Sequence, residues 1–129
     1  MSMELEVKLV EGALAWEREA LPSQGTVGAH AVFEGLVRGT ENGRILTALD
    51  YEAYEPMTTR GLEKLAHELG DGKILSAKIE HSIGRVPVGE CSFRLTVCAA
   101  HRKEALAFMD AFIDRMKLEV PIWKNPVWA

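Results

Sequence analysis

Two lysines near the end of the sequence are spaced so that they can do chemistry. Lys117 and Lys124 flank the apolar segment Val120-Pro121-Ile122-Trp123. Apolar surroundings disfavour the charged form of an amine, so a lysine held there would have a lowered pKa and could act as a nucleophile or a base. The alternative is a helix end with two solvated lysines, in which Lys117 is only a surface partner of Asp114. Because exposed lysines are common, the spacing alone favours this second interpretation.

Arginine and histidine residues at two other junctions are candidates for binding an anion. His101 and Arg102 lie where a predicted strand ends and a predicted helix begins, and no Ser, Thr, Asp or Asn immediately precedes that helix. Its free N–H groups, its dipole and an arginine would together form an anion site. The alternative is that His101 caps the helix and Arg102 pairs with a carboxylate such as Glu104.

A polar loop is bracketed by Arg38 and Arg44. A flexible arginine on such a loop can close over a phosphate or a carboxylate with two hydrogen bonds. Loops often carry binding residues, yet surface arginines are commoner than functional ones, so position alone leaves both interpretations open.

The sequence lacks the spacing of other common sites. The histidines are His30, His67, His81 and His101, with no H-x-H or H-E-x-x-H pattern, so we expect no metal site. His81 lies on the apolar face of a predicted strand, which favours a core or interface histidine. No G-x-G-x-x-G, Walker A or G-x-S-x-G pattern occurs, and we expect no cofactor.

Length and composition predict one globular domain over residues 1–129. The chain is 47% hydrophobic and 26% charged, which argues against disorder. Its formal net charge of -4 gives no reason to expect a nucleic-acid partner, so an anionic ligand requires a local cluster of cations. No apolar run approaches the roughly 20 residues that span a bilayer, and the N-terminal residues do not form a secretion signal.

The two cysteines, Cys91 and Cys98, lie seven positions apart in one predicted strand. An odd spacing places them on opposite faces, about 23 Å apart at about 3.3 Å per residue. They cannot form a disulfide, which requires Cα atoms within about 7 Å. We therefore expect a reduced, cytoplasmic protein in which both thiols are packed rather than catalytic.

Periodicity predicts the elements that must position these residues. Strands are expected over residues 4–9, 27–37, 45–54, 75–83 and 91–99, and helices over 14–21, 56–70 and 103–118. Asn42-Gly43 predicts a hairpin in which 45–54 returns along 27–37. Residues 84–90 read as a connection containing a short edge strand. Ala105, Phe108, Met109, Phe112 and Met116 form the expected buried stripe of the last helix. The pattern indicates an α+β domain, a mostly antiparallel sheet with packed helices.

Several motifs together resemble one known family. They are Gly35-Leu36-Val37-Arg38, the segment from Leu49 to Met57, His81-Ser82-Ile83-Gly84, Val88-Gly89-Glu90, His101-Arg102, and Lys117 followed by Val120-Pro121-Ile122-Trp123-Lys124. In order and spacing this set is similar to the large subunit of molybdopterin synthase, the MoaE family, over roughly residues 25–125. The last motif is the most specific of them.

The resemblance implies an α/β-hammerhead-type fold and a homodimer with a small subunit docked at each end. The small subunit is a ubiquitin-like sulfur carrier whose C-terminal Gly-Gly is a thiocarboxylate. Its sulfur is transferred to cyclic pyranopterin monophosphate to form the dithiolene of molybdopterin. The resemblance assigns catalytic roles to Lys117 and Lys124 and substrate binding to Arg38, His101 and Arg102, part of each site coming from the neighbouring protomer.

Three segments depart from the family pattern: Ser82, Gly39-Thr40-Glu41 and Asn125-Pro126. Family members often have an arginine at the first, an Asp-His-Asn-like loop at the second and an acidic residue at the third. We therefore weigh the sulfurtransferase against a dimeric module that binds a ubiquitin-like tail or a small anion without turnover. A metal-dependent hydrolase is a third interpretation, and the absence of ligand spacing counts against it.

Overall fold

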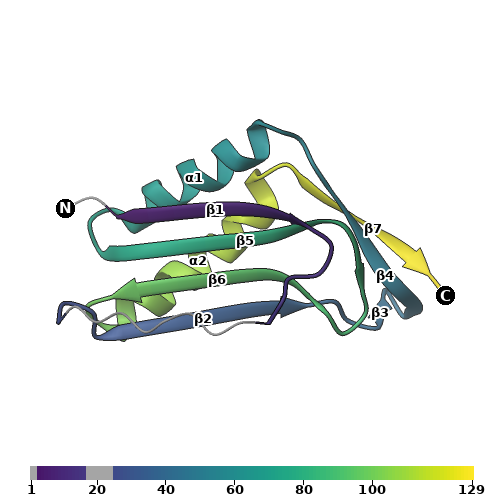
Figure 1. The fold of residues 1–129 in the computed structure, drawn as a ribbon, viewed down its shortest axis with the longest axis horizontal. Helices are drawn as coiled ribbons and strands as arrows, with labels where there is room; N and C mark the ends of the chain where they lie inside the picture. Colours follow the sequence, from purple (N-terminus) through teal and green to yellow (C-terminus); the bar gives the residue numbers. More distant parts are fainter. Residues whose placement is uncertain (1–2, 17–24) are drawn as a thin grey trace.

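Four long strands form the main sheet of the protein, which is described by a computed structural model over residues 3–16 and 25–129. They are β1 (Glu4–Glu11), β5 (Ile74–Pro87), β6 (Cys91–Ala99) and β2 (Ala29–Leu36), and they lie side by side in that order (Figure 1). β1 runs parallel to β5, whereas β5–β6 and β6–β2 are antiparallel. The helices α1 (Met57–Gly70) and α2 (Arg102–Glu119) pack on this sheet.

A smaller group of strands extends from one end of the main sheet and forms an arm. β5 continues past Gly84, where φ is 78°, and its last residues pair with β4 (Arg44–Ala53). β4 also pairs with the short β3 (Thr40–Glu41) and with β7 (Ile122–Trp128), both antiparallel (Figure 1, right). The C-terminal strand is thus attached to the middle of the chain rather than to α2, which precedes it.

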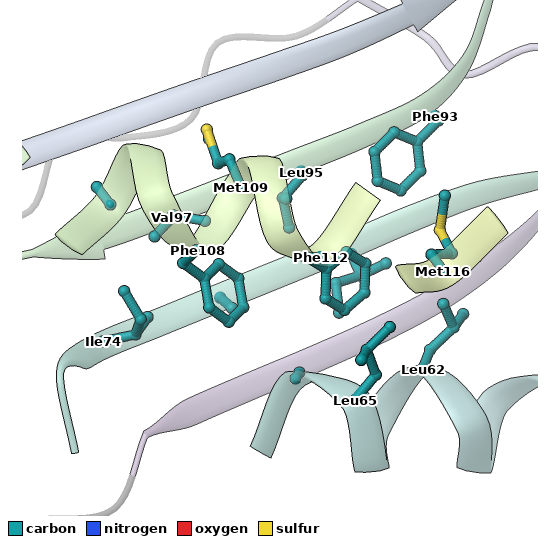
Figure 2. Packing of buried hydrophobic residues seen from close by; sticks show 14 of the residues in the cluster. Leu62, Leu65, Ile74, Phe93, Leu95, Val97, Phe108, Met109, Phe112 and Met116 are labelled. Carbon is teal, nitrogen blue, oxygen red and sulfur yellow. The ribbon is translucent and has the colours of Figure 1, made fainter. Parts of the chain in front are cut away.

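The core lies between the main sheet and the two helices. The buried stripe predicted for α2 is confirmed, since Ala105, Phe108, Met109, Phe112 and Met116 are all buried. The Phe108 and Phe112 rings stack with centroids 5.7 Å apart. Figure 2 shows them among Leu62 and Leu65 of α1 and apolar residues of the sheet. Burial of this apolar surface is the main force that holds α2, and hence its two ends, in place.

The other face of the main sheet carries a buried ionic cluster. Arg94 is 3% exposed and contacts Glu34 at 2.9 Å and Glu80 at 3.4 Å. It also donates a hydrogen bond to the Ala15 carbonyl at 2.7 Å, so residues 12–15 cross this face. A buried charge is tolerated because it is paired and hydrogen-bonded.

No helix in the described part of the chain is both long and apolar enough to cross a membrane.

Several sequence-based predictions need correction. Leu14, Ala15 and Trp16 are not helical, and residues 17–21 of that predicted helix lie outside the described residues. The turn at Asn42-Gly43 is confirmed, with φ values of 51° and 78°. The pairing was wrong, because β2 pairs with β6 and only the two-residue β3 returns along β4. Local turn chemistry identifies a reversal but does not determine which long strands become neighbours.

Candidate active site

A cavity of about 550 Å³ lies where the C-terminal half of α2 meets the arm. Its walls come from α2, the ends of β2, β5 and β6, the β3 hairpin, β4 and β7. The polar and charged residues that line it are Arg38, Glu41, Tyr51, His81, Ser92, Lys117 and Lys124. Three of the five predicted site residues, Arg38, Lys117 and Lys124, therefore share one cavity, although Arg38 is far from the two lysines in the sequence.

The turn between α2 and β7 positions the two lysines. Lys117 lies in the last turn of α2, which ends at Glu119 and is followed by the C-cap residue Val120. The chain then reverses at Pro121, and β7 runs antiparallel to β4 with Lys124 opposite Tyr51. The apolar segment between the lysines thus forms the reversal that brings both to one cavity.

The reversal is anchored by a buried threonine. Thr58, in the first turn of α1, is fully buried and donates a hydrogen bond to the Pro121 carbonyl at 2.6 Å. Its hydroxyl also accepts the backbone N–H of Tyr54 at 2.8 Å. Both partners are backbone groups, so this side chain ties the end of β4 and the start of α1 to the start of β7.

The surroundings of the lysines differ from the apolar pocket considered from the sequence. Both side chains are exposed in the single chain, and Lys124 retains 56% of its side-chain exposure. The chain's own residues therefore do not desolvate them. Lys117 forms no ion pair with Asp114 or any other group in the described part of the chain, so the surface-pair alternative is not observed either.

The cavity carries a positive charge excess. The Lys, Arg, Asp and Glu residues that line it are Arg38, Lys117, Lys124 and Glu41. The carboxylate Oε1 of Glu41 lies 3.0 Å from Lys124 Nζ, whereas Arg38 and Lys117 have no such partner among the described residues. Two unpaired cations facing one cavity attract an anion, and they do so most strongly when the ligand excludes water.

An aromatic cluster forms the floor of the cavity. His81 is 6% exposed and lies between Tyr51 and Phe93, with ring centroids 5.1 and 5.8 Å away. Its Nδ1 is 2.8 Å from the Ser82 carbonyl, which only a protonated Nδ1 can satisfy. Burial lowers the pKa of His81, with this hydrogen bond acting in the opposite direction. His81 is thus a neutral, buried histidine, as its place on the apolar strand face predicted.

His101 and Arg102 do not reach this cavity within the same chain. His101 is the N-cap residue of α2, and it lies sixteen positions before Lys117. A helix rises about 1.5 Å per residue, so the two ends of α2 are about 24 Å apart. The capping alternative is wrong, because His101 makes no side-chain cap hydrogen bond. His101 Nδ1 lies 3.9 Å from Glu104, and Arg102 is exposed with no ion pair among the described residues.

Arg44 is directed away from the cavity. Its guanidinium lies 4.0 Å from the centre of the Trp128 ring, a cation–π contact that fastens β7 to the start of β4. Of the two arginines that bracket the hairpin, only Arg38 lines the cavity. The two arginines of this loop therefore have different roles, although the sequence placed them together.

The segments that depart from the family pattern have definite places. Ser82 is buried and donates a hydrogen bond to the Gly12 carbonyl at 2.6 Å, so it is a structural residue. Asn125 contacts Glu52 at 3.5 Å on the arm. Glu41 is the one that enters the cavity.

Sequence reasoning missed the cavity residues Glu41, Tyr51, Ser92 and Phe93 as site components. Tyr51 donates a hydrogen bond to Ser92 across the floor at 3.0 Å. No local pattern signals this group, because it is assembled from β3, β4 and β6. Burial raises the pKa of the Cys91 thiol, which disfavours the thiolate that a nucleophile requires. No group of three or more His, Cys, Asp or Glu residues within 3–16 and 25–129 is arranged to hold a metal ion.

Comparison with known proteins identifies relatives over most of the chain. The family model described as "MoaE protein" matches residues 9–119. The molybdopterin synthase catalytic subunit of Dictyostelium discoideum is 38% identical over 110 residues, which cover 83% of this chain and 70% of that protein. The subunit of the same name from Bacillus subtilis is 39% identical over 102 residues, or 78% of this chain and 65% of that protein.

Solved structures share the fold. Molybdopterin synthase from Staphylococcus aureus matches with a TM-score of 0.78 and 28% identity, covering 94% of this chain and 90% of that chain. A complex of subunits 1 and 2 of molybdopterin-converting factor from Helicobacter pylori matches with a TM-score of 0.73 and 27% identity, covering 95% and 89%. The predicted α+β fold is confirmed by these matches. With a family model that spans most of its length and relatives at this level of identity, the chain belongs to the MoaE family.

Proposed function

We propose that this chain is the large, catalytic subunit of a molybdopterin synthase. It transfers sulfur from the C-terminal thiocarboxylate of a small ubiquitin-like carrier to cyclic pyranopterin monophosphate, forming the dithiolene of molybdopterin. The observation that carries the proposal is the cavity in which Arg38, Lys117 and Lys124 converge in a member of the MoaE family. The free cysteines Cys91 and Cys98 suit a reducing, cytoplasmic location.

The charges of the two reactants explain why the cavity is cationic. The carrier's tail and the phosphate-bearing substrate are both anionic, so their approach must be offset by fixed positive charge. Lys117 and Lys124 receive the thiocarboxylate from the α2 and β7 sides. Arg38, at the end of β2, binds the phosphate with its planar guanidinium.

Lys117 is assigned the chemical role and Lys124 the positioning role. Lys117 belongs to a helix held by five buried residues, so its Cα is rigidly placed. Its ammonium group stabilises the oxyanion that develops when the carrier's terminal acyl carbon becomes tetrahedral. Lys124 lies on β7, opposite Tyr51, and orients the incoming tail.

The site is completed by a second copy of the chain. His101 and Arg102 are exposed at the N-terminus of α2, about 24 Å along the helix from Lys117. A homodimer in which the partner's α2 N-terminus faces the cavity supplies these two side chains together with free helix N–H groups. The phosphate is then bound between the partner's helix N-terminus and Arg38.

Reconstitution tests the proposal. The purified chain is mixed with a ubiquitin-like carrier ending in a Gly-Gly thiocarboxylate and with cyclic pyranopterin monophosphate, and dithiolene formation is measured. The carrier in its carboxylate form is the control, because it has no sulfur to transfer. Product is expected only with the thiocarboxylate. Binding of the carrier without product would favour a non-catalytic module instead.

A further inference from the structure

The ion pair between Glu41 and Lys124 places a carboxylate inside a cavity that has to bind anions. The two residues lie 83 positions apart in the sequence and meet at 3.0 Å. Glu41 also reduces the charge excess of the cavity, since it is the carboxylate among lining residues that include Arg38, Lys117 and Lys124. A site built only for tight anion binding would not contain it.

We infer that Glu41 is a displaceable counter-ion, which occupies Lys124 while the cavity is empty and yields it to the carboxylate or thiocarboxylate of the carrier's tail. The inference rests on the proposed function and deepens it. The carboxylate of Glu41 and the terminal carboxylate of a peptide have the same charge and the same two acceptor oxygens. Each can therefore take the place of the other on one ammonium group.

The exposure of the pair shows that exchange is accessible. Lys124 has 56% and Glu41 20% of its side chain exposed, so water and ligands reach both groups. The Arg94 cluster offers a contrast, because Arg94 and Glu80 are only 4% and 7% exposed and separate at the cost of an unpaired buried charge. A surface pair whose lysine is exposed and whose carboxylate is partly exposed contributes little to stability and opens more easily than a buried one.

The hairpin that carries Glu41 is lightly attached. β3 has two residues, and its register joins only Thr40 to Ile45 and Glu41 to Arg44. The turn residues Asn42 and Gly43 are exposed, and Gly43 has open space around it. The Glu41 side chain has no described partner other than Lys124, so nothing else opposes its departure.

As a counter-ion, Glu41 promotes turnover by helping the spent carrier to leave. Formation of a dithiolene uses two sulfur atoms, so two spent carriers must leave as carboxylates. A cavity with three uncompensated cations would retain the spent tail, whereas Glu41 competes for Lys124 and favours release. We expect Glu41 to weaken ligand binding and to speed dissociation together.

The test compares Glu41→Gln with wild type using two probes. The first is acetate, a minimal carboxylate, titrated while the Lys124 side chain is followed by NMR. The second is a carboxylate-form ubiquitin-like carrier ending in Gly-Gly, whose affinity and dissociation rate are measured by surface plasmon resonance. Glu41→Gln should bind both probes about two- to fivefold more tightly, the range typical of a surface ion pair. For the carrier, the tighter binding should appear as slower dissociation.

Two further variants make the result specific. Glu52→Gln removes the same charge from the arm outside the cavity lining and should leave both affinities unchanged. In a Lys124→Ala background, Glu41→Gln should have a smaller effect, because the shared partner is gone. An equal effect there, or unchanged or weaker binding by Glu41→Gln alone, overturns the inference. Failure of the wild-type chain to bind the carrier would instead refute the proposed function, while the acetate comparison still decides the role of Glu41.

Discussion

His101 and Lys117 lie at the two ends of the same helix, α2, and the buried stripe between them holds that helix against the sheet. A straight helix of this length keeps them about 24 Å apart. No side-chain rearrangement within one chain brings them to one substrate. If both act on the same phosphate-bearing molecule, the active site contains residues of two protomers.

A mixed-dimer experiment tests this arrangement. Lys117→Ala and Arg102→Ala chains are each expected to be nearly inactive as homodimers. When they are denatured and refolded together, random pairing produces heterodimers with one intact and one doubly mutated site. About a quarter of wild-type activity should return. Sites contained within one chain would give no recovery.

Removal of the Lys117 ammonium group should abolish most of the chemistry. Lys117→Ala is expected to lower kcat about 100-fold or more, as loss of an oxyanion-stabilising donor typically does. The side chain is exposed, so the free energy of unfolding should change little. Lys73→Ala removes an exposed lysine in the turn after α1 and is the matched control. Unchanged kcat in a folded Lys117→Ala protein would show that the assignment is wrong.

Thr58 should be the stability-determining link to the site. Thr58→Val keeps the shape but leaves the Pro121 carbonyl and the Tyr54 N–H without their partner. A cost of roughly 2 kcal/mol in the free energy of unfolding is expected from urea denaturation. Thr59→Val is the control, since its hydroxyl bonds only the exposed Glu55 carboxylate and should cost less than about 1 kcal/mol.

Protein stability should fall as His81 is forced to bind a proton. Its folded-state pKa is lowered by burial, so below the ordinary value of 6.5 the unfolded chain binds more protons than the folded one. The free energy of unfolding is therefore highest above pH 6.5. It decreases as the pH falls toward the folded-state pKa of His81, by up to about 1.4 kcal/mol per pH unit.

Urea denaturation between pH 7.5 and 5 measures this dependence. His81→Leu should flatten it, because no ionisable group remains between Tyr51 and Phe93. The exposed His67 supplies the control variant, His67→Gln, which should keep the wild-type slope. A slope that survives His81→Leu would assign the pH dependence to other residues.

The sequence by itself determined the elements whose patterns are local. β6 alternates cleanly, and α2 repeats its apolar residues at helical spacing, so both were predicted almost to the residue. The same holds for α1 and for the turn at Asn42-Gly43. The resemblance carried by Lys117, Lys124 and the residues between them identified the family.

Only the tertiary structure decided how these pieces combine into a site. β7 was not predicted, because a segment that follows Pro121, contains Pro126 and lacks alternation becomes a strand only through its pairing with β4. That pairing brings Lys124 to Glu41 and turns the exposed run after α2 into one wall of the cavity. The rigid length of α2 likewise separates His101 from Lys117. Contacts between distant residues depend on which apolar surfaces are buried together, and no local pattern contains that information.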